Sequence, residues 1–256
     1  MRVAVVVSTW TGHPANLLHS LCESMAQHPA GVQYHLFLSA NGTEYSVPAE
    51  VAPLFTRIFI RENSGYNLGA WDYAWRRLSG YDRFLFLQDE CRVVKDNWLR
   101  RFNQRFEATP RCGLVGENLK RSWDKPWSDL CDPQLLSSKD EVSVTKAVQA
   151  RRFRIILDTW GIHEGATARH MTTVVQFTSR SILEEVNGYN LGQTKKEAMA
   201  AEIGFSRKVE AKGYALVQIG RHRHSVIAHR QWPPNHLLAR LKRSFLKRVV
   251  GEPAER

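Results

Sequence analysis

Two adjacent carboxylates follow an apolar stretch of the chain. Residues 84–87 read Phe-Leu-Phe-Leu, which indicates a buried strand, and Gln88, Asp89 and Glu90 come directly after it. Carboxylates beside a buried strand are costly to remove from water unless a cation meets them. Their hard oxygens suit Mg²⁺ or Mn²⁺, and such an ion could bridge to a substrate diphosphate. Acidic residues also follow strands as ordinary turn or cap residues, so both interpretations stay open for this pair taken alone.

Polar residues also follow two earlier apolar stretches. Ser8 and Thr9 follow the β-branched stretch 3–7, and Asn41 begins an Asn-Gly turn after the stretch 34–38. Ligands of open α/β sheets bind beyond the carboxyl ends of the strands. These residues are therefore candidates for contact with a substrate.

The segment 61–72 offers a further candidate, because two glycines four residues apart open a predicted helix. Such a turn can bring backbone N–H groups close to a phosphate or a ribose. The segment has neither the Lys-Ser/Thr of a P-loop nor a complete GxGxxG motif. Glycines also mark ordinary helix starts, so the segment decides nothing on its own.

The elements that must position these residues alternate between strands and helices. Apolar stretches predict strands at 3–7, 34–38, 57–60, 84–87, 172–177 and 214–219, and helical spacing predicts helices at 14–27, 70–78, 180–187 and 195–212. This alternation implies right-handed crossovers and a mainly parallel sheet with helices on both faces. The polar, tryptophan-containing segment 118–170 lacks the pattern and predicts a long excursion that forms a lid or a binding surface.

The composition predicts a globular protein with an anionic partner. Among 256 residues, 43% are hydrophobic, and 36 Lys and Arg outnumber 25 Asp and Glu to give a formal net charge of +11. Nucleic acid, a phosphate-rich small molecule and an acidic membrane surface all fit this charge. No apolar stretch approaches the ~20 residues that span a bilayer, and no signal peptide is evident, so we expect a cytoplasmic protein. The four separated cysteines predict reduced thiols rather than a zinc site.

Six segments, taken together and in order, resemble the family-2 type glycosyltransferases of the GT-A fold. They are the N-terminal strand and residues 39–43, 63–70, 87–90, 180–189 and 202–214. The resemblance implies a Rossmann-like α/β fold with a mixed, mainly parallel sheet flanked by helices. It covers residues 1–220, the expected glycosyltransferase domain, and leaves 221–256 as a basic C-terminal segment.

The resemblance also implies roles for individual residues. Glu90 aligns with the last acid of the family's DxD motif, so it would hold Mn²⁺ or Mg²⁺ with Asp89 beside it. Glu202 aligns with the catalytic base that takes the proton of the acceptor hydroxyl, with Glu197 as the substitute. His229 is the expected further metal ligand among the late histidines. The donor would contact Ser8, Thr9, Asn41, Asn63, Gly65, Asn67, Gly69 and Asp89. The alternatives are that Glu202 is a solvated helix carboxylate and that the histidines are surface residues.

Two departures from the family pattern leave parts of this assignment open. Ala40 stands where many members have an aspartate that recognises the nucleobase, so the resemblance does not identify the base. Gln88 replaces the first acid of the metal motif, which weakens the expected metal site. Both departures also fit a non-catalytic, glycan-binding relative.

The C-terminal segment carries much of the positive charge. Residues 221–256 contain nine Lys and Arg against two Glu, and 236–250 form a predicted basic amphipathic helix. Such a helix can lie in an anionic membrane interface, where each basic residue contributes roughly 1 kcal/mol, or it can pack on the protein's own core. Membrane contact would place the protein on the inner face of the membrane and make a lipid-linked saccharide a suitable acceptor.

These patterns predict an inverting, metal-dependent, hexosyltransferase-like enzyme. It would move a sugar from a nucleotide-sugar donor to a glycan or lipid-linked acceptor, in surface polysaccharide biosynthesis. The alternative is a basic nucleic-acid-binding protein, which the charge and eight tryptophans suggest. Two observations argue against it: the positive charge is concentrated at one end of the chain, and the sequence has no recognised nucleic-acid-binding motif. We therefore expect no nucleic-acid partner.

Overall fold

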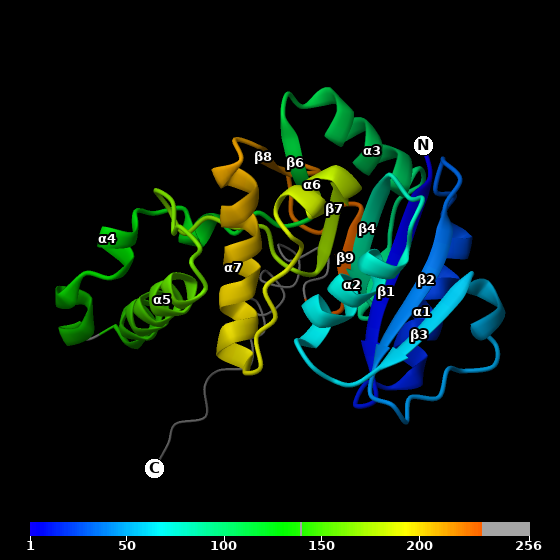
Figure 1. The fold of residues 1–256 in the computed structure, drawn as a ribbon, viewed down its shortest axis with the longest axis horizontal. Coiled ribbons are helices and arrows are strands. Elements are labelled where there is room, and N and C mark those ends of the chain that lie inside the picture. The colour runs from blue at the N-terminus through cyan, green and yellow to red at the C-terminus, as the bar shows by residue number, and fades with distance from the viewer. Residues whose placement is uncertain (139, 232–256) are drawn as a thin grey trace, which may run out of the picture.

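A seven-stranded sheet forms the centre of the computed structural model, which describes residues 1–138 and 140–231 (Figure 1). The strand order is β3-β2-β1-β4-β7-β6-β8. The strands are β1 (Val3–Trp10), β2 (His35–Asn41), β3 (Arg57–Arg61), β4 (Arg83–Gln88), β6 (Cys112–Gly116), β7 (Val175–Ser179) and β8 (Ala215–Gln218). The predicted mixed, mainly parallel sheet is confirmed.

Strand β1 lies at the centre of the parallel part of the sheet. It pairs in parallel with β2 and with β4. Every residue from Val3 to Thr9 is buried, as expected for a strand covered on both faces. The register places Ser8 opposite both Ser39 and Gln88, so the carboxyl ends of three strands meet at one edge.

Strand β7 runs against its neighbours. It pairs antiparallel with β4 and with β6, while β6 and β8 are parallel to each other. β6 therefore ends, and β7 begins, at the edge where β4 ends. The chain leaves this edge after Gly116 and returns to it before Val175.

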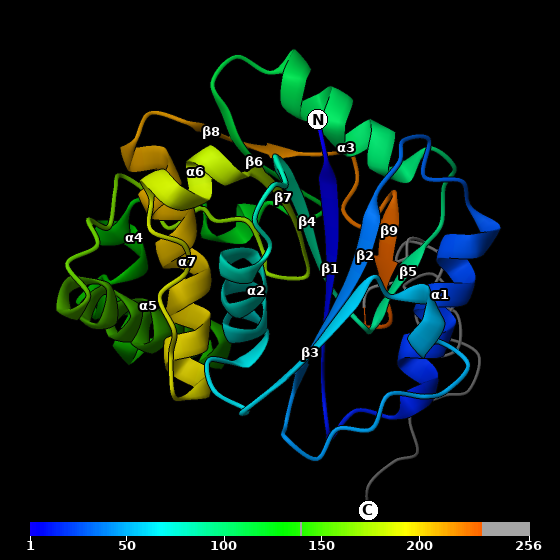
Figure 2. The ribbon, with the colours of Figure 1, turned by 45° about the vertical axis from the view of Figure 1, so that its right-hand side comes forward.

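Helices cover both faces of the sheet. They are α1 (Ala15–Gln27), α2 (Tyr66–Arg77), α3 (Trp98–Ala108), α6 (Arg180–Glu185) and α7 (Lys195–Ala211). α1 and α2 lie on opposite sides of β1, β2 and β3 (Figure 2). On α2, Trp71 is fully buried and stacks on Phe86 of β4, with ring centroids 5.4 Å apart. The sequence patterns missed α3 and β6.

The segment 118–170 is largely helical, which corrects the expectation of an irregular excursion. It contains η2 (Arg121–Trp123), α4 (Trp127–Leu130), η3 (Pro133–Ser137) and the 19-residue α5 (Glu141–Thr159). Phe153 and Leu157 of α5 form a small second core with Trp123 and Trp127, which packs against Ile203 of α7. Figure 1 shows α5 at the end of the molecule remote from β3. The excursion is thus a helical subdomain with its own apolar centre.

A short second sheet brings the late part of the chain back to the end of β4. β5 (Cys91–Val93) pairs antiparallel with β9 (Ile227–His229), and Cys91 lies opposite His229. The predicted helix at 236–250 lies outside the described residues. Within residues 1–138 and 140–231, no helix is long and apolar enough to cross a membrane. All four cysteines are free thiols.

Candidate active site

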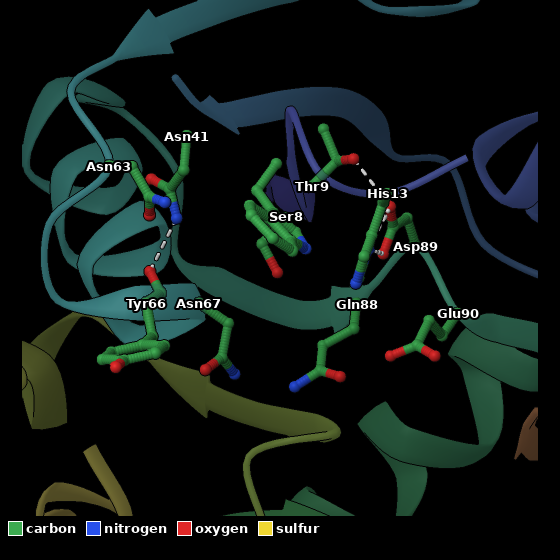
Figure 3. A pocket seen from close by; sticks show the side chains of 11 residues that line it. Ser8, Thr9, His13, Asn41, Asn63, Tyr66, Asn67, Gln88, Asp89 and Glu90 are labelled. Atoms are coloured by element: carbon green, nitrogen blue, oxygen red, sulfur yellow. Dashed lines mark hydrogen bonds and ion pairs between the residues drawn. The ribbon is translucent and has the colours of Figure 1, made fainter. Parts of the chain in front are cut away.

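A cavity of about 290 Å³ opens where β1, β2 and β4 end (Figure 3). Its walls are Ser8, Thr9, Trp10, His13, Asn41, Asn63, Tyr66, Asn67, Gln88, Asp89 and Glu90. Asn41, Asn63, Tyr66 and Asn67 line one end, and the carboxylates of Asp89 and Glu90 lie at the other, beside His13 and Gln88 (Figure 3). Three strand ends that are far apart in sequence therefore build one pocket with two chemically different ends.

Asp89 is the buried member of the acidic end. Its carboxylate accepts a 2.6 Å hydrogen bond from the Thr9 hydroxyl, and Nδ1 of His13 lies 2.8 Å from its other oxygen. Burial lowers the pKa of His13, but the hydrogen bond to Asp89 and the charges of Asp89 and Glu90 outweigh it, so the net shift is upward. The Asp89 carboxylate thus holds both the end of β1, through Thr9, and the loop that follows it, through His13.

Glu90 lines the acidic end of the pocket, and the buried His229 approaches it from β9. Nε2 of His229 lies 3.6 Å from Oε2 of Glu90, which is longer than a hydrogen bond. Two ligands of one divalent ion, each bonded at about 2.1 Å, are roughly 3–3.5 Å apart. The pair therefore fits a metal ion in spacing and in ligand chemistry.

The proton on His229 bears on that fit. The backbone N–H of Gln231 donates to Nδ1 at 3.2 Å, so the ring proton of the neutral imidazole lies on Nε2. Burial lowers the pKa of His229 by more than the charges of Glu90 and Asp89 raise it. Metal binding at Nε2 would move the ring proton to Nδ1 and release Gln231.

Among the residues that the structure describes, Glu90 and His229 are not joined by a third metal-binding side chain. Within the described ranges 1–138 and 140–231, no three His, Cys, Asp or Glu side chains converge on one point. A metal held by Glu90 and His229 would need oxygen ligands from a bound substrate or from water. The chemistry of the site matches an ion that arrives with, or is completed by, a diphosphate.

The strand that carries His229 is anchored by a buried carboxylate. Glu117, directly after β6, has no exposed surface, and its oxygens accept the backbone N–H groups of Ser225, Val226 and Ile227 at 2.8, 2.9 and 2.6 Å. Burial raises the pKa of Glu117 to about 7, although the three hydrogen bonds lower it. Glu117 fixes the position of His229 through the backbone of β9.

The amide end of the pocket is built around Asn41. Its Nδ2 donates to the Tyr66 carbonyl at 2.8 Å, and its Oδ1 accepts a hydrogen bond from Arg61, which also donates to the Ser64 carbonyl at 2.9 Å. The backbone of Tyr66 has φ 54°, a left-handed conformation that is rare for an aromatic residue. These contacts fix the backbone of Tyr66, whose ring is 42% exposed and lines the cavity, as does Trp10, which is 41% exposed.

The two predicted glycines support the pocket without lining it. Gly65 has φ 71°, and a Cβ on Gly69 would lie 2.1 Å from the Ser64 carbonyl oxygen. Both positions are fixed by backbone geometry at the start of α2. Their role in donor contact stays a prediction, whereas Asn63 and Asn67 do line the cavity.

Glu202 of α7 is linked to the pocket through Thr173. Its Oε2 accepts the backbone N–H and the hydroxyl of Thr173, each at 2.6 Å. The carbonyl of Thr173 accepts in turn from Gln88 and Asn67, at 2.9 and 2.8 Å, and both of these line the cavity. Glu202 is therefore connected to the pocket-lining residues Gln88 and Asn67 through one intervening residue, Thr173.

The structure gives Glu202 an environment unlike that of its substitute. Burial raises the pKa of Glu202, but hydrogen bonds from His170 and Thr173 and the charge of His170 lower it by more. Glu197, by contrast, caps α7 by accepting the Thr194 N–H at 2.9 Å and is partly exposed. Glu197 thus has a structural role at the helix start.

The sequence matches no protein-family model. No curated protein matches it either. The structure does have counterparts. A mannosyltransferase from Pyrobaculum calidifontis, solved with GDP-mannose and Mn²⁺, superposes with a TM-score of 0.56 over 99% of this chain, at 14% sequence identity. The chain spans 66% of the length of that protein.

A second counterpart has the same architecture. Glucosyl-3-phosphoglycerate synthase from Mycobacterium tuberculosis, solved with Mn²⁺, UDP and glucosyl-3-phosphoglycerate, gives a TM-score of 0.51 at 15% identity. The match covers 99% of this chain and 81% of the synthase. The fold is the GT-A fold of glycosyltransferases. The fold expectation is thereby confirmed.

Within this GT-A fold, most of the predicted donor residues come together. The cavity collects Ser8, Thr9, Asn41, Asn63, Asn67 and Asp89, together with Glu90. His229 faces Glu90 from β9, and Glu202 approaches through Thr173. The roles of these residues in binding and catalysis stay predictions.

Several residues of the site were missed by sequence reasoning. Trp10, His13, Tyr66, His170 and Glu117 were not singled out. Trp10 follows Thr9 directly and His13 lies four residues after it, so the carboxyl-end rule could have included both. Nothing local to Glu117 or His170 signals their position, because each meets a segment far away in the chain.

Proposed function

We propose that the chain is a metal-dependent glycosyltransferase that uses a nucleotide-sugar donor. The observation that carries this proposal is the approach of Glu90 and His229, 3.6 Å apart at one end of a pocket formed by strand ends in a GT-A fold. The pair has the spacing and ligand types for a divalent ion. The opposite end of the pocket offers amides and the exposed ring of Tyr66, and the exposed ring of Trp10 also lines the cavity; aromatic rings suit a nucleoside.

The proposed donor orientation follows from the two ends of the pocket. The nucleoside lies near Asn41, Trp10 and Tyr66, and the diphosphate lies near Glu90 and His229. Among the described residues that line the cavity there is no Lys or Arg. Since a diphosphate carries several negative charges, its binding beside two carboxylates requires a cation.

Mn²⁺ or Mg²⁺, when bound, would offset the charge that develops on the departing nucleoside diphosphate. Glu90 would supply a carboxylate oxygen to the ion, and His229 would supply a ring nitrogen. Asp89 would support the site without binding the ion, because its oxygens bind the Thr9 hydroxyl and the His13 ring. This arrangement modifies the prediction that Asp89 is itself a ligand.

We propose that Glu202 is the base that accepts the proton of the acceptor hydroxyl. The acceptor oxygen then attacks the anomeric carbon on the face opposite the diphosphate, which gives inversion in a single step. The connection of Glu202 to Gln88 and Asn67 through Thr173 supports this placement. A hexose is the proposed sugar, and a glycan or lipid-linked saccharide is the proposed acceptor.

We further propose peripheral contact with an anionic membrane and a role in surface polysaccharide biosynthesis. The support is the excess of nine basic over two acidic residues in 221–256. Co-sedimentation with vesicles that contain anionic lipid tests this part of the proposal. Binding that is unchanged when residues 236–256 are removed would contradict it.

The first test is thermal stability against UDP, GDP, CMP and dTDP, each with and without Mn²⁺. A ligand that binds only the folded state raises the melting temperature by mass action. We expect one nucleotide to raise it in the presence of Mn²⁺ and the increase to disappear in Glu90→Gln and His229→Asn. The matched control is Glu62→Gln, an exposed acid outside the cavity, which should keep the full increase.

The same test separates the alternatives. An increase with no need for Mn²⁺ would contradict the metal site and leave the nucleotide site standing. No increase with any nucleotide would contradict the donor pocket as a whole. A steep salt dependence of affinity for DNA or RNA would then favour a nucleic-acid-binding protein. Sugar transfer, measured with the nucleotide sugar of the responding base, distinguishes an enzyme from a non-catalytic relative.

A further inference from the structure

His170 lies against Glu202, on the side away from Thr173. Its ring is buried between the helical subdomain and α7, with 5% of the side chain exposed. Nδ1 lies 2.8 Å from the carbonyl oxygen of Ala168, and Nε2 lies 3.1 Å from Oε1 of Glu202. The Trp123 ring packs edge-on against the imidazole, with centroids 6.1 Å apart. Both nitrogens of the ring are therefore held in a fixed direction.

The hydrogen-bond partners determine where the ring protons are. A carbonyl oxygen can only accept, so Nδ1 of His170 must carry a hydrogen. In a neutral imidazole, Nε2 is then an acceptor. An acceptor nitrogen 3.1 Å from an ionised carboxylate would bring two lone pairs together. The contact between His170 and Glu202 is favourable only when one additional proton is shared by the pair.

The remaining contacts of Glu202 show how much of its carboxylate is free. A carboxylate has about four acceptor positions. The N–H and hydroxyl of Thr173 occupy two positions on Oε2, and His170 occupies one on Oε1. One position is left for the hydroxyl of an acceptor. While the pair holds its shared proton, Glu202 is a poor base, because a second proton would give the buried pair a net positive charge.

We propose that His170 and Glu202 form a one-proton pair, in which His170 is the positioning residue that converts Glu202 into an effective base when the shared proton is lost. This inference rests on the proposed function of Glu202. In the reactive form, the neutral His170 directs its Nε2 lone pair at ionised Glu202. The acceptor O–H bond breaks, the oxygen forms its bond to the anomeric carbon, and the bond to the diphosphate breaks with its electrons. The proton passes to Glu202 and restores the hydrogen bond to Nε2.

The charged groups around the pair do not substitute for His170. In the segment 118–170, the backbone N–H of Lys120 donates to the His170 carbonyl at 2.8 Å. Arg169, which precedes His170 in the sequence, forms an ion pair with Glu210 at 3.3 Å. On α7, Arg207 donates to the Thr167 carbonyl at 2.7 Å and also pairs with Glu210. The two arginines are thus engaged elsewhere. From the pocket, the uncharged Gln88 and Asn67 approach Thr173.

The first arm of the test needs no substrate. Long-range ¹H–¹⁵N NMR of the histidine ring nitrogens reports which of them carry protons across a pH titration. We expect His170 to carry both ring protons at low pH and to become the Nδ1–H form as the pH rises. In Glu202→Gln, the Nε2 proton of His170 loses its carboxylate partner, so we expect its NMR signal to change. A neutral Nε2–H form, or a titration that Glu202→Gln leaves unchanged, would overturn the proposal.

The second arm measures the release of UDP or GDP from UDP-glucose and GDP-mannose with Mn²⁺, as a function of pH. In the wild type, kcat should fall at low pH as the pair takes up its proton. His170→Gln keeps a donor toward Glu202 but cannot take up a proton. We expect it to lower the maximal kcat about tenfold or more, with KM for the donor unchanged, and to shift the acidic limb to lower pH. His163→Gln, an exposed histidine of the same segment, is the matched control and should keep the wild-type profile.

The outcomes distinguish this inference from the proposal it rests on. If Glu202→Gln retains wild-type kcat, Glu202 is not the base and the proposed mechanism fails. If Glu202→Gln loses activity while His170→Gln keeps the wild-type acidic limb, the base stands and the pair is overturned. A His170→Gln variant that loses activity with a raised KM and an unshifted limb has a purely structural defect, which also overturns the pair.

Discussion

The Glu117 carboxylate accepts the backbone N–H of Ile227 at 2.6 Å and so ties the end of β6 to the strand that carries His229. No part of Glu117 is exposed. The contact joins residues 110 positions apart, and it places a group whose pKa is raised to about 7 behind the proposed metal site. The stability of the folded chain should therefore depend on the protonation of this one carboxyl.

Glu117→Gln should make the stability less sensitive to pH. A carboxyl whose pKa rises from 4.5 to about 7 on folding stabilises the protein fully below 4.5, and this contribution is lost as the pH rises through about 7. The loss is on the order of 3 kcal/mol. Urea unfolding at about pH 5 and pH 8 should show this slope in the wild type and not in Glu117→Gln. Glu50→Gln, an exposed acid, should keep it; an equal slope in both variants would contradict the assignment.

Asp89→Asn should destabilise the protein by about 1–3 kcal/mol, because an amide oxygen cannot replace both carboxylate contacts to Thr9 and His13. The matched control is Asp96→Asn. Asp96 also contacts a histidine, His28, at 2.7 Å, but its side chain is 63% exposed, so we expect a loss below about 1 kcal/mol. Urea unfolding of both variants compares them directly. Equal losses would show that the buried contacts contribute nothing beyond those of a surface pair.

Gly69→Ala should weaken both the fold and nucleotide binding. The new Cβ would lie 2.1 Å from the Ser64 carbonyl oxygen, so the segment before α2 must move. We expect a loss of more than about 2 kcal/mol, together with a smaller nucleotide-induced rise in melting temperature. Gly161→Ala is the control. Gly161 has φ +64° and no atom within 4 Å of its Cβ position, so only the cost of the left-handed backbone, about 1 kcal/mol, applies there.

Phe153→Ala should destabilise the helical subdomain. Phe153 is buried in the second core with Trp123 and Leu157, and its truncation should cost about 3–5 kcal/mol. Ile155, two residues later on α5, is 68% exposed, so Ile155→Ala should change stability by less than about 0.5 kcal/mol. Hydrogen exchange should show the loss of protection concentrated in 121–170. Equal effects of the two substitutions would contradict the second core.

The part of the site at the strand ends was predictable because it follows from parallel pairing alone. Once β1, β2 and β4 are identified as neighbouring parallel strands, Ser8, Asn41 and Asp89 must lie at one edge. The apolar stretches that form these strands are short and continuous, which is the pattern that sequence reasoning handles well.

The parts that were missed depend on contacts between distant segments. The pairing of β9 with β5 was missed, because neither three-residue strand has a distinct pattern; His229 itself was predicted from the family resemblance and not from this pairing. Helix α5 was missed for a different reason. Its buried face includes Ala147 and Phe153, but apolar residues such as Val142 and Ile155 are exposed. The apolar residues therefore do not follow a clear helical spacing in the sequence.

The reversed direction of β7 makes the helical subdomain an exchangeable unit. The segment 117–174 leaves the sheet after Gly116 and re-enters beside it, because Gly116 pairs with Gln176. An insertion whose two ends are adjacent can grow, shrink or be replaced without shifting the strands on either side, provided that Glu117 keeps its contacts to β9. The part of the pocket that is built on β1, β2 and β4 can thus stay constant while the surface that the subdomain presents changes. Under the proposed function, this separates the donor site from the part of the molecule that is free to vary.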